Sequence, residues 1–260
     1  MGNTTAGMIV TTRRDFLGMA SATALLPGRS LAGQRDFVVF STFASTRGAG
    51  SRSSALAEAA EAAVAHRKIL LLDRPVELSQ KWSPPPGLIL RGDGTENSRI
   101  DWAGEGDAIE ITGAIDIDGI TIDGALHPTS DRAAGDHSCL VAIHGSLGAT
   151  PNYLSGIVIG HLRIRRTRSV ALVLANLEGL RVGTIELLDI FCNGMIISGV
   201  SNSHFENIIA NNIGDLKESG HRRGSAVAVF AETKPVSPWY DTGKILKTTG
   251  LRFASVHIEK

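Results

Sequence analysis

The sequence predicts an all-β fold, a parallel β-helix with three strands per coil and a capping α-helix near its N-terminus. The first observation is a four-point spacing of mostly apolar residues, with steps of two, three and two, that recurs along the chain. The second is its period, because three copies begin at Ile157, Leu180 and Ser203, 23 residues apart. The third is the composition, since 29 glycines and 5% aromatic residues are typical of short strands joined by tight turns.

Five copies of this spacing predict paired strands around a corner. A step of two keeps side chains on one face of a strand, so the step of three marks a bend after which both halves still face inward. Gly119, Gly160 and Gly183 fall at the bend, where a missing Cβ eases the corner. The copies are Ile115-Ile117-Ile120-Ile122, Ile157-Ile159-Leu162-Ile164, Leu180-Val182-Ile185-Leu187, Ser203-Phe205-Ile208-Ala210 and Leu251-Phe253-Val256-Ile258.

A single apolar strand is predicted between successive corners. These strands are Ile109–Ile111, Leu140–Ile143, Val170–Leu174, Met195–Ile197 and Ala226–Phe230. Three strands in about 23 residues match the repeat of a parallel β-helix, in which each coil buries its inner face by stacking on the next. An antiparallel sandwich would instead need hairpins with two-residue turns, and Asn-Gly occurs only at Asn193-Gly194.

A helix precedes the coils. The segment 51–68, SRSSALAEAAEAAVAHRK, is rich in helix formers, with Ser53 or Ser54 as its N-cap and with Leu56, Ala60 and Val64 on one stripe. Apolar strands follow it directly. Because the first coil of a β-helix leaves its strands unpaired on one side, we expect this helix to cover that end.

The segment from Ser54 to Gly94, SALAEAAEAAVAHRKILLLDRPVELSQKWSPPPGLILRGDG, resembles the opening of pectate-lyase-superfamily (pectin lyase-like) proteins. The resemblance extends over residues 53–260 and implies a right-handed β-helix. It departs from the family where STRGAGSRSS replaces a Gly-Ala-x-x-Asp-Gly segment. The chain is also similar to exported bacterial β-helix repeat proteins that carry a twin-arginine signal and have no assigned activity.

The first 32 residues are predicted to be a twin-arginine export signal. Arg13-Arg14 precedes Phe16-Leu17 and a short apolar run, and Ser30-Leu31-Ala32 provides small residues for a signal peptidase. The mature chain would then begin at Gly33, reside in the periplasm or outside the cell, and keep no membrane anchor. An ordinary amphipathic N-terminal tail is the alternative.

The domain is expected to span residues 33–260 and to be incomplete or uncapped at its C-terminal side. The last corner, Leu251 to Ile258, is followed by nothing that would cover it. A homo-oligomer covering this edge is therefore a further expectation.

Charge and cysteine content limit the partners. Lysine plus arginine and aspartate plus glutamate each total 26, for a net charge of zero, so no basic field favours nucleic acid. Cys139 and Cys192 have no flanking histidine cluster, so we expect buried core residues and no metal or other cofactor. Ca²⁺ at Asp116, Asp118 and Asp123 is the alternative, although strand alternation is interpreted as turning all three toward water.

The candidate site lies at the turns that follow each corner, residues 123–139, 165–169, 188–194 and 211–225. Two of these turns are long, and stacking would bring all four together into a groove. The predicted catalytic residues are His221, Asp215 and Arg168. The predicted substrate-binding residues are Arg165, Arg166, Asn193, Asn212, Arg222 and Arg223, with Trp239 and Tyr240 contributed by the insertion 231–250, which is expected opposite this groove.

These residue types favour an acidic glycan. Arginine pairs bidentately with uronate carboxylates, and aromatic rings stack on sugars. The predicted function is an exported protein that acts on or binds a polysaccharide, as a lyase or a hydrolase. The paired aspartates of polygalacturonase-like members are missing, since Cys192-Asn193-Gly194 stands in their place, and Gly220-His221 is a partial match to a second motif. The alternative is a noncatalytic binding or scaffold module of the periplasm or cell surface.

Overall fold

The computed structural model describes residues 37–46, 52–94, 96–104, 106–125, 139–147, 150–214, 224–230 and 246–259. The chain divides into two units, Met1–Arg35 and Asp36–Lys260. All of the described residues belong to the second unit, so the predicted export signal lies outside them. Within the described ranges, no helix is both long enough and apolar enough to cross a bilayer.

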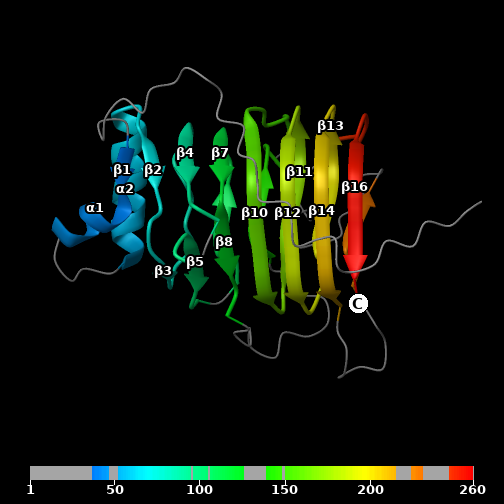
Figure 1. The fold of residues 1–260 in the computed structure, drawn as a ribbon. Coiled ribbons are helices and arrows are strands. Elements are labelled where there is room, and N and C mark those ends of the chain that lie inside the picture. Colours follow the sequence, from blue (N-terminus) through cyan, green and yellow to red (C-terminus); the bar gives the residue numbers. More distant parts are fainter. Residues whose placement is uncertain are drawn as a thin grey trace, which may run out of the picture. The chain divides into compact units, whose positions relative to one another are not determined.

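Two parallel sheets make up the second unit, and we call them the large sheet and the small sheet (Figure 1). The large sheet runs in the order β1 (Phe37–Val39), β2 (Ile69–Leu71), β4 (Leu88–Arg91), β7 (Ile115–Asp118), β10 (Ile157–Thr167), β12 (Arg181–Ile190), β14 (His204–Ile213) and β16 (Arg252–Glu259), with β3 (Val76–Leu78), β5 (Arg99–Trp102) and β8 (Ile120–Asp123) alongside. The small sheet contains β6 (Ile109–Ile111), β9 (Cys139–His144), β11 (Val170–Glu178), β13 (Met195–Ser201) and β15 (Val227–Phe230).

The chain alternates between the two sheets and advances by one strand at each return. From β10 it passes to β11 in the small sheet and then to β12, which lies beside β10. Corresponding residues of adjacent coils pair with each other, as Ile159 does with Val182, and Val182 with Phe205. Every strand pair among the described residues is parallel. The predicted all-β parallel fold is confirmed.

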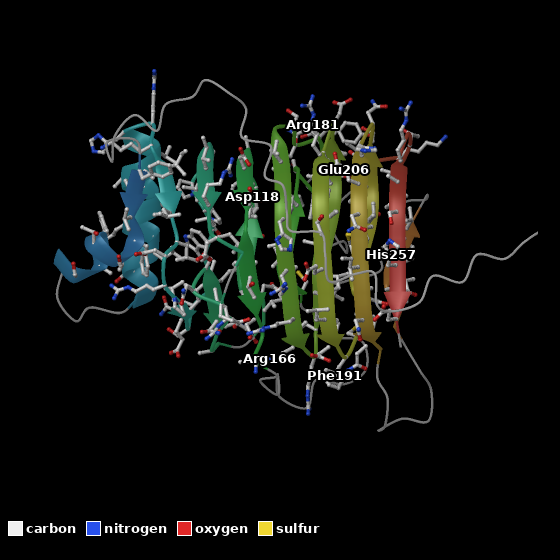
Figure 2. The ribbon with its side chains drawn as sticks, viewed as in Figure 1. Asp118, Arg166, Arg181, Phe191, Glu206 and His257 are labelled. Atoms are coloured by element: carbon white, nitrogen blue, oxygen red, sulfur yellow. The ribbon has the colours of Figure 1, made fainter. Side chains whose placement is uncertain are left out.

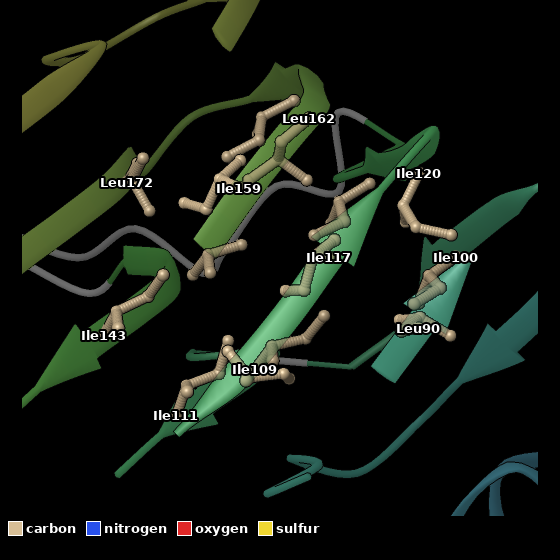
Figure 3. Close-up of a cluster of buried hydrophobic side chains, with 14 of the residues drawn as sticks. Leu90, Ile100, Ile109, Ile111, Ile117, Ile120, Ile143, Ile159, Leu162 and Leu172 are labelled. Carbon is tan, nitrogen blue, oxygen red and sulfur yellow. The ribbon is translucent and has the colours of Figure 1, made fainter. Parts of the chain in front are cut away.

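The four-point spacing identifies the buried face. In the copies that begin at Ile115, Ile157, Leu180 and Ser203, all four residues are buried. Figure 3 shows how the inward side chains of neighbouring coils pack, with Ile117 and Ile159 among them. Burying a side chain of this size stabilises the fold by about 1.5–3 kcal/mol relative to leaving it exposed, so the stack of coils is held mainly by this apolar interior.

The corners differ from the prediction in strand count. β7 and β8 are separate strands on either side of Gly119, as predicted, but β10, β12 and β14 each continue through the corner as one strand. The bend still interrupts pairing, because the residues flanking Gly160 pair with those flanking Gly183 while the two glycines do not. The bend at the corner is therefore small enough for β10 and β12 to pair again directly after the two glycines.

Helix α2 (Arg52–Ala65) packs on β2, β3 and β4, at the N-terminal side of the stack. Leu56 and Ala60 of the predicted stripe are fully buried, and Val64 packs against the core. The predicted N-cap is wrong, because α2 begins at Arg52 and both Ser53 and Ser54 lie inside the helix. A second helix, α1 (Phe40–Thr46), was not predicted; its first residue, Phe40, is buried.

The small sheet is apolar on both of its faces. Leu172 and Leu174 of β11 point into the main core, whereas Val173, with Ala142 of β9 and Ile196 of β13, belongs to a second buried apolar cluster. This explains why these strands have almost continuous apolar sequences instead of a simple alternation.

Candidate functional site

The turn after each large-sheet strand repeats its backbone conformation from coil to coil. Arg166, Asp189 and Asn212 all have left-handed φ angles, of 54°, 56° and 56°. Asparagine and aspartate adopt this conformation more readily than other non-glycine residues. Asn212 Nδ2 donates to Asp189 Oδ1 over 2.8 Å, which links two successive coils. Arg166 and Phe191 lie at the same end of the strands in Figure 2, so these turns line one edge of the unit.

Asp123 is the buried centre of this turn edge. Its carboxylate accepts hydrogen bonds from Arg165 Nε at 2.8 Å, from Arg166 Nε at 2.9 Å and from the backbone N–H of Ala125 at 2.8 Å. The interpretation that Asp116, Asp118 and Asp123 all face water is wrong for Asp123, whose side chain is fully buried. Arg165 and Arg166 of the next coil bind this carboxylate in place of water. The alternation of residues along one strand cannot predict such a contact, because the partners lie on another strand.

These contacts decide the ionisation of Asp123. Burial alone raises the pKa of its carboxyl group. The hydrogen bonds from Arg166, Ala125 and Arg165 act the other way and together outweigh burial, so the pKa of Asp123 lies below its ordinary value. Asp123 is therefore an ionised group that holds the turn together.

The side chains around Asp123 form a series of ion pairs in which positive and negative charges alternate. Glu96 accepts two hydrogen bonds from Arg165, of 2.8 and 2.7 Å, and one from Arg99 Nη1 at 2.7 Å. Arg99 also donates to Asp101 through Nε at 2.6 Å. Hydrogen bonds from Arg165 and Arg99 hold the pKa of Glu96 below its ordinary value. The guanidinium groups of Arg165 and Arg166, both predicted to bind substrate, are thus already paired with carboxylates.

The other predicted site residues within the described ranges occupy three different environments. Arg168 is exposed on the turn after β10, and among the described residues it has no ion-pair partner. Asn193 accepts a 2.9 Å hydrogen bond from the backbone N–H of Ser225, in the next coil. Asn212 binds Asp189, as described above. Six predicted residues lie outside the described ranges, namely Asp215, His221, Arg222, Arg223, Trp239 and Tyr240.

A second polar cluster lies on and beside β6 and β9, the first two strands of the small sheet, and we call it the small-sheet cluster: Lys81, Asp107, Glu110, Cys139 and His144. Glu110 stands between two inward residues of β6, so its side chain is on the outer face. Its carboxylate contacts Lys81 Nζ at 2.8 Å and His144 Nε2 at 3.1 Å. Asp107 Oδ1 accepts a 2.9 Å hydrogen bond from the Cys139 backbone N–H.

The two carboxyl groups of the small-sheet cluster have pKa values that shift in opposite directions. Burial raises the pKa of Asp107 above its ordinary value, and the nearby charge of Glu110 adds to this. Burial also raises that of Glu110, but hydrogen bonds from Lys81 and His144 outweigh it, and the net pKa is lowered. The hydrogen bond to Glu110 raises the pKa of Lys81. The environment therefore favours the neutral form of Asp107 and the ionised form of Glu110, each relative to its ordinary value.

His144 bridges this cluster to the following turn. Its Nδ1 lies 2.8 Å from the carbonyl oxygen of Gly145, and its Nε2 lies 3.1 Å from Glu110 Oε1. Once Glu110 is ionised, both neighbours are hydrogen-bond acceptors for the ring. The imidazole therefore orients the Glu110 carboxylate from the side opposite Lys81.

Sequence reasoning missed the small-sheet cluster. Its members come from three separate segments, Lys81, Asp107 to Glu110 and Cys139 to His144, which share no spacing motif, and stacking alone brings them together. One signal was available, since Glu110 interrupts an apolar strand at an outward position. Cys139 was predicted to be a buried core residue and is fully buried, while Cys192 is partly buried and both thiols are free. Burial raises the pKa of the Cys139 thiol well above its ordinary value, so it is unreactive.

No group of three or more metal-ligating side chains occurs in the part of the chain that the structure describes. Asp116, one of the residues considered for Ca²⁺, is bound bidentately by Arg91 at 2.9 and 2.6 Å.

Comparison with known proteins assigns neither a family nor an activity to this chain. No protein-family model matches the chain, and no curated protein matches it. Among solved structures, the chain is similar to "Crystal structure of Agl-KA catalytic domain", with 13% identity over 88% of this chain and 55% of that one. The chain thus spans about half the length of that structure. The TM-score is 0.37, which is too low to support an argument about fold or chemistry.

Proposed function

We propose that this chain is an exported, right-handed parallel β-helix protein of the pectate-lyase-like type that binds and hydrolyses a polysaccharide, most simply an acidic glycan. The observation that carries the proposal is the small-sheet cluster, in which Glu110 contacts Lys81 and His144, and in which the pKa values of Asp107 and Glu110 shift in opposite directions. Cys139 is the first residue of β9, and Asp107 lies two residues before β6, so the cluster lies at the end of the small sheet where the predicted turns enter it. The predicted groove and this cluster would then form one surface.

The chemistry follows from the two carboxyl groups. Hydrolysis of a glycosidic bond needs one protonated carboxylic acid to donate to the leaving oxygen, and one carboxylate to attack the sugar or to activate water. Asp107 fits the first role, because burial keeps it protonated to higher pH. Glu110 fits the second, because Lys81 and His144 keep it ionised and fix its orientation.

The acidic character of the glycan is inferred from the turn edge. Arg168 is exposed there and available to a uronate carboxylate. Asp215 and His221, predicted to be catalytic, and Arg222, Arg223, Trp239 and Tyr240, predicted to bind substrate, remain proposed site residues on sequence grounds. Arg165, Arg166, Asn193 and Asn212 would act mainly by shaping the turns that carry these contacts.

The test is a panel of uronate-containing and neutral glycans incubated with the purified protein. New reducing ends without ultraviolet absorbance indicate hydrolysis, whereas absorbance from unsaturated ends indicates a lyase. We expect Glu110→Gln and Asp107→Asn each to lower kcat by about 10²-fold or more, the usual contribution of acid–base catalysis. Glu206→Gln, at an exposed position of the large sheet, is the matched control and should leave kcat unchanged.

The pH profile gives a second readout. Activity requires ionised Glu110 and protonated Asp107, so it should fall at low pH as Glu110 gains a proton and at higher pH as Asp107 loses one. We therefore expect a bell-shaped profile whose acid limb reports Glu110 and whose alkaline limb reports Asp107. Asp107→Asn should remove the alkaline limb of the profile. An alkaline limb that persists in this variant would exclude Asp107 as the acid.

A noncatalytic binding module is the second candidate. The sequence favours it, because Cys192-Asn193-Gly194 stands where polygalacturonase-like members carry paired aspartates. Retained glycan binding with no product from any substrate would support this candidate over the hydrolase.

Export by the twin-arginine route is part of the proposal and rests on Arg13 and Arg14. Replacing both with lysine should retain the protein in the cytoplasm, and N-terminal sequencing of exported protein should begin at Gly33. Unchanged export of the double-lysine variant would contradict this route.

A further inference from the structure

At one stacked position of the small sheet, an asparagine stands between two glycines. Gly145, Asn176 and Gly199 each follow directly on residues that pair with one another in three successive coils. The φ angle of Asn176 is 50° and that of Gly199 is 66°. Left-handed φ angles are uncommon at residues other than glycine. The backbone at this position therefore suits glycine, and what Asn176 adds is its side chain.

The side chain of Asn176 is fully buried and joins two distant segments. Its Nδ2 donates a 3.0 Å hydrogen bond to the carbonyl oxygen of Ser146, in the turn after β9. Its Oδ1 accepts a 2.8 Å hydrogen bond from the backbone N–H of Leu246. The backbone carbonyl of Asn176 also accepts one of 2.9 Å from the N–H of Leu154. The turn at residues 145–146 is thus fixed to the coil above it by a side-chain amide.

The same turn contacts the small-sheet cluster through His144. The carbonyl oxygen of Gly145 lies 2.8 Å from His144 Nδ1, and a carbonyl only accepts hydrogen bonds, so this contact requires a proton on Nδ1. The other ring nitrogen, Nε2, lies 3.1 Å from Glu110 Oε1. The turn has little room to shift, because a Cβ placed on Gly145 would lie 2.5 Å from the carbonyl oxygen of Asn176. The position of the Gly145 carbonyl therefore sets the direction in which the imidazole points.

We propose that Asn176 is a positioning residue for the small-sheet cluster: it fixes the turn at residues 145–146, and the Gly145 carbonyl then holds the His144 ring against Glu110. The inference rests on the proposed hydrolase, in which Glu110 attacks the sugar or activates water. Asn176 acts through His144, so its removal should disturb the orientation of Glu110 and leave the binding of glycan unchanged.

The first test observes the Nδ1–H signal of His144 by nitrogen–proton NMR of the imidazole ring, assigned with His144→Gln. Asn176→Gly keeps the left-handed backbone but removes the amide, so the Nδ1–H should lose its protection and its signal should broaden or disappear. Asn202→Gly is the matched control, because Asn202 has a similar φ of 48° and its side chain contacts Glu178; the His144 signal should persist.

Asn176→Asp is a second variant that makes the test independent of lost packing. It keeps the size of the side chain and the acceptor for the Leu246 N–H, but the ionised carboxylate cannot donate to the Ser146 carbonyl. At neutral pH the His144 signal should be lost in this variant as well. Circular dichroism checks that all of the variants remain folded.

The second test uses a glycan that the wild type hydrolyses. Asn176→Gly should lower kcat by about tenfold or more with KM unchanged, because misplacing a catalytic group affects the chemical step, and Asn202→Gly should change neither. An unchanged His144 signal in Asn176→Gly, or an unchanged kcat despite a lost signal, would overturn the positioning role. If the wild type hydrolyses no glycan and the signal is nevertheless lost in the variant, the positioning of His144 is supported and the hydrolase is the proposal that fails.

Discussion

Asp123 shows how much of this turn depends on one buried carboxylate. It is enclosed on all sides, and its partners Arg165, Arg166 and the Ala125 amide compensate for the water it lost. Removing one partner of such a pair leaves the others with unsatisfied hydrogen bonds, which costs more than the pair contributes.

At the residue scale we therefore expect Asp123→Asn to lower the free energy of unfolding by about 2–4 kcal/mol. Asp189→Asn is the control, because it lies on an exposed turn with the same backbone conformation; it should change stability by less than about 0.5 kcal/mol. Urea denaturation measures both. Equal effects of the two substitutions would contradict a structural role for Asp123.

The acid limb of stability tests the same residue. Since the folded pKa of Asp123 is lowered, its contribution is complete above the unfolded value of about 3.9 and is lost as pH falls through the folded pKa. Between pH 7 and pH 5 the wild-type free energy should change little from this source, and below about pH 4 it should decrease. Asp123→Asn should flatten this decrease, as followed by urea midpoints at each pH.

At the element scale, the bends are shaped by glycines that neighbouring coils approach closely. A Cβ placed on Gly183 would lie 2.4 Å from the carbonyl oxygen of Gly160 in the preceding coil. That oxygen is backbone and cannot move aside without shifting its strand. The bend is thus a contact between coils as well as a local feature of each strand.

We expect Gly183→Ala to destabilise the fold by about 1–3 kcal/mol, the usual cost of overpacking. Gly179→Asn is the control. Gly179 has a left-handed φ of 67° with open space around its Cα, and Asn202 takes the same conformation at the equivalent position of the next coil. That substitution should be nearly neutral. Thermal unfolding measures the stability of both variants. If Gly183→Ala does not lower the unfolding temperature, the two strands at the bend can separate enough to accommodate the added Cβ.

At the scale of the whole molecule, stability should vary along the stack of coils. A coil with neighbours on both sides buries its inward residues fully, whereas the coil that carries β16 does not. We expect Ile185→Ala to cost about 2–5 kcal/mol. Val256→Ala should cost less than about 1 kcal/mol when measured on monomeric protein, because Val256 is half exposed already. Similar costs at both positions would mean that the end of the stack is covered in solution.

Much of the coil could be predicted from the sequence, and the reason is periodicity. A row such as Leu180, Val182, Ile185 and Leu187 must face inward wherever it occurs, because burial of apolar side chains is the largest favourable contribution to folding. The strand count at the corners was less predictable. Whether Gly160 splits a strand or only bends it depends on how the ladders of adjacent coils resume pairing.

The sequence by itself determined that the chain forms parallel coils, where its inward faces lie, and that a helix stands at the N-terminal side. Each of these follows from a local period or a local composition. Only the tertiary structure decided which polar side chains meet. Asp123 with Arg166, and Glu110 with Lys81 and His144, are distant in sequence and are brought together by stacking, so their burial and protonation depend on neighbours that no single strand contains.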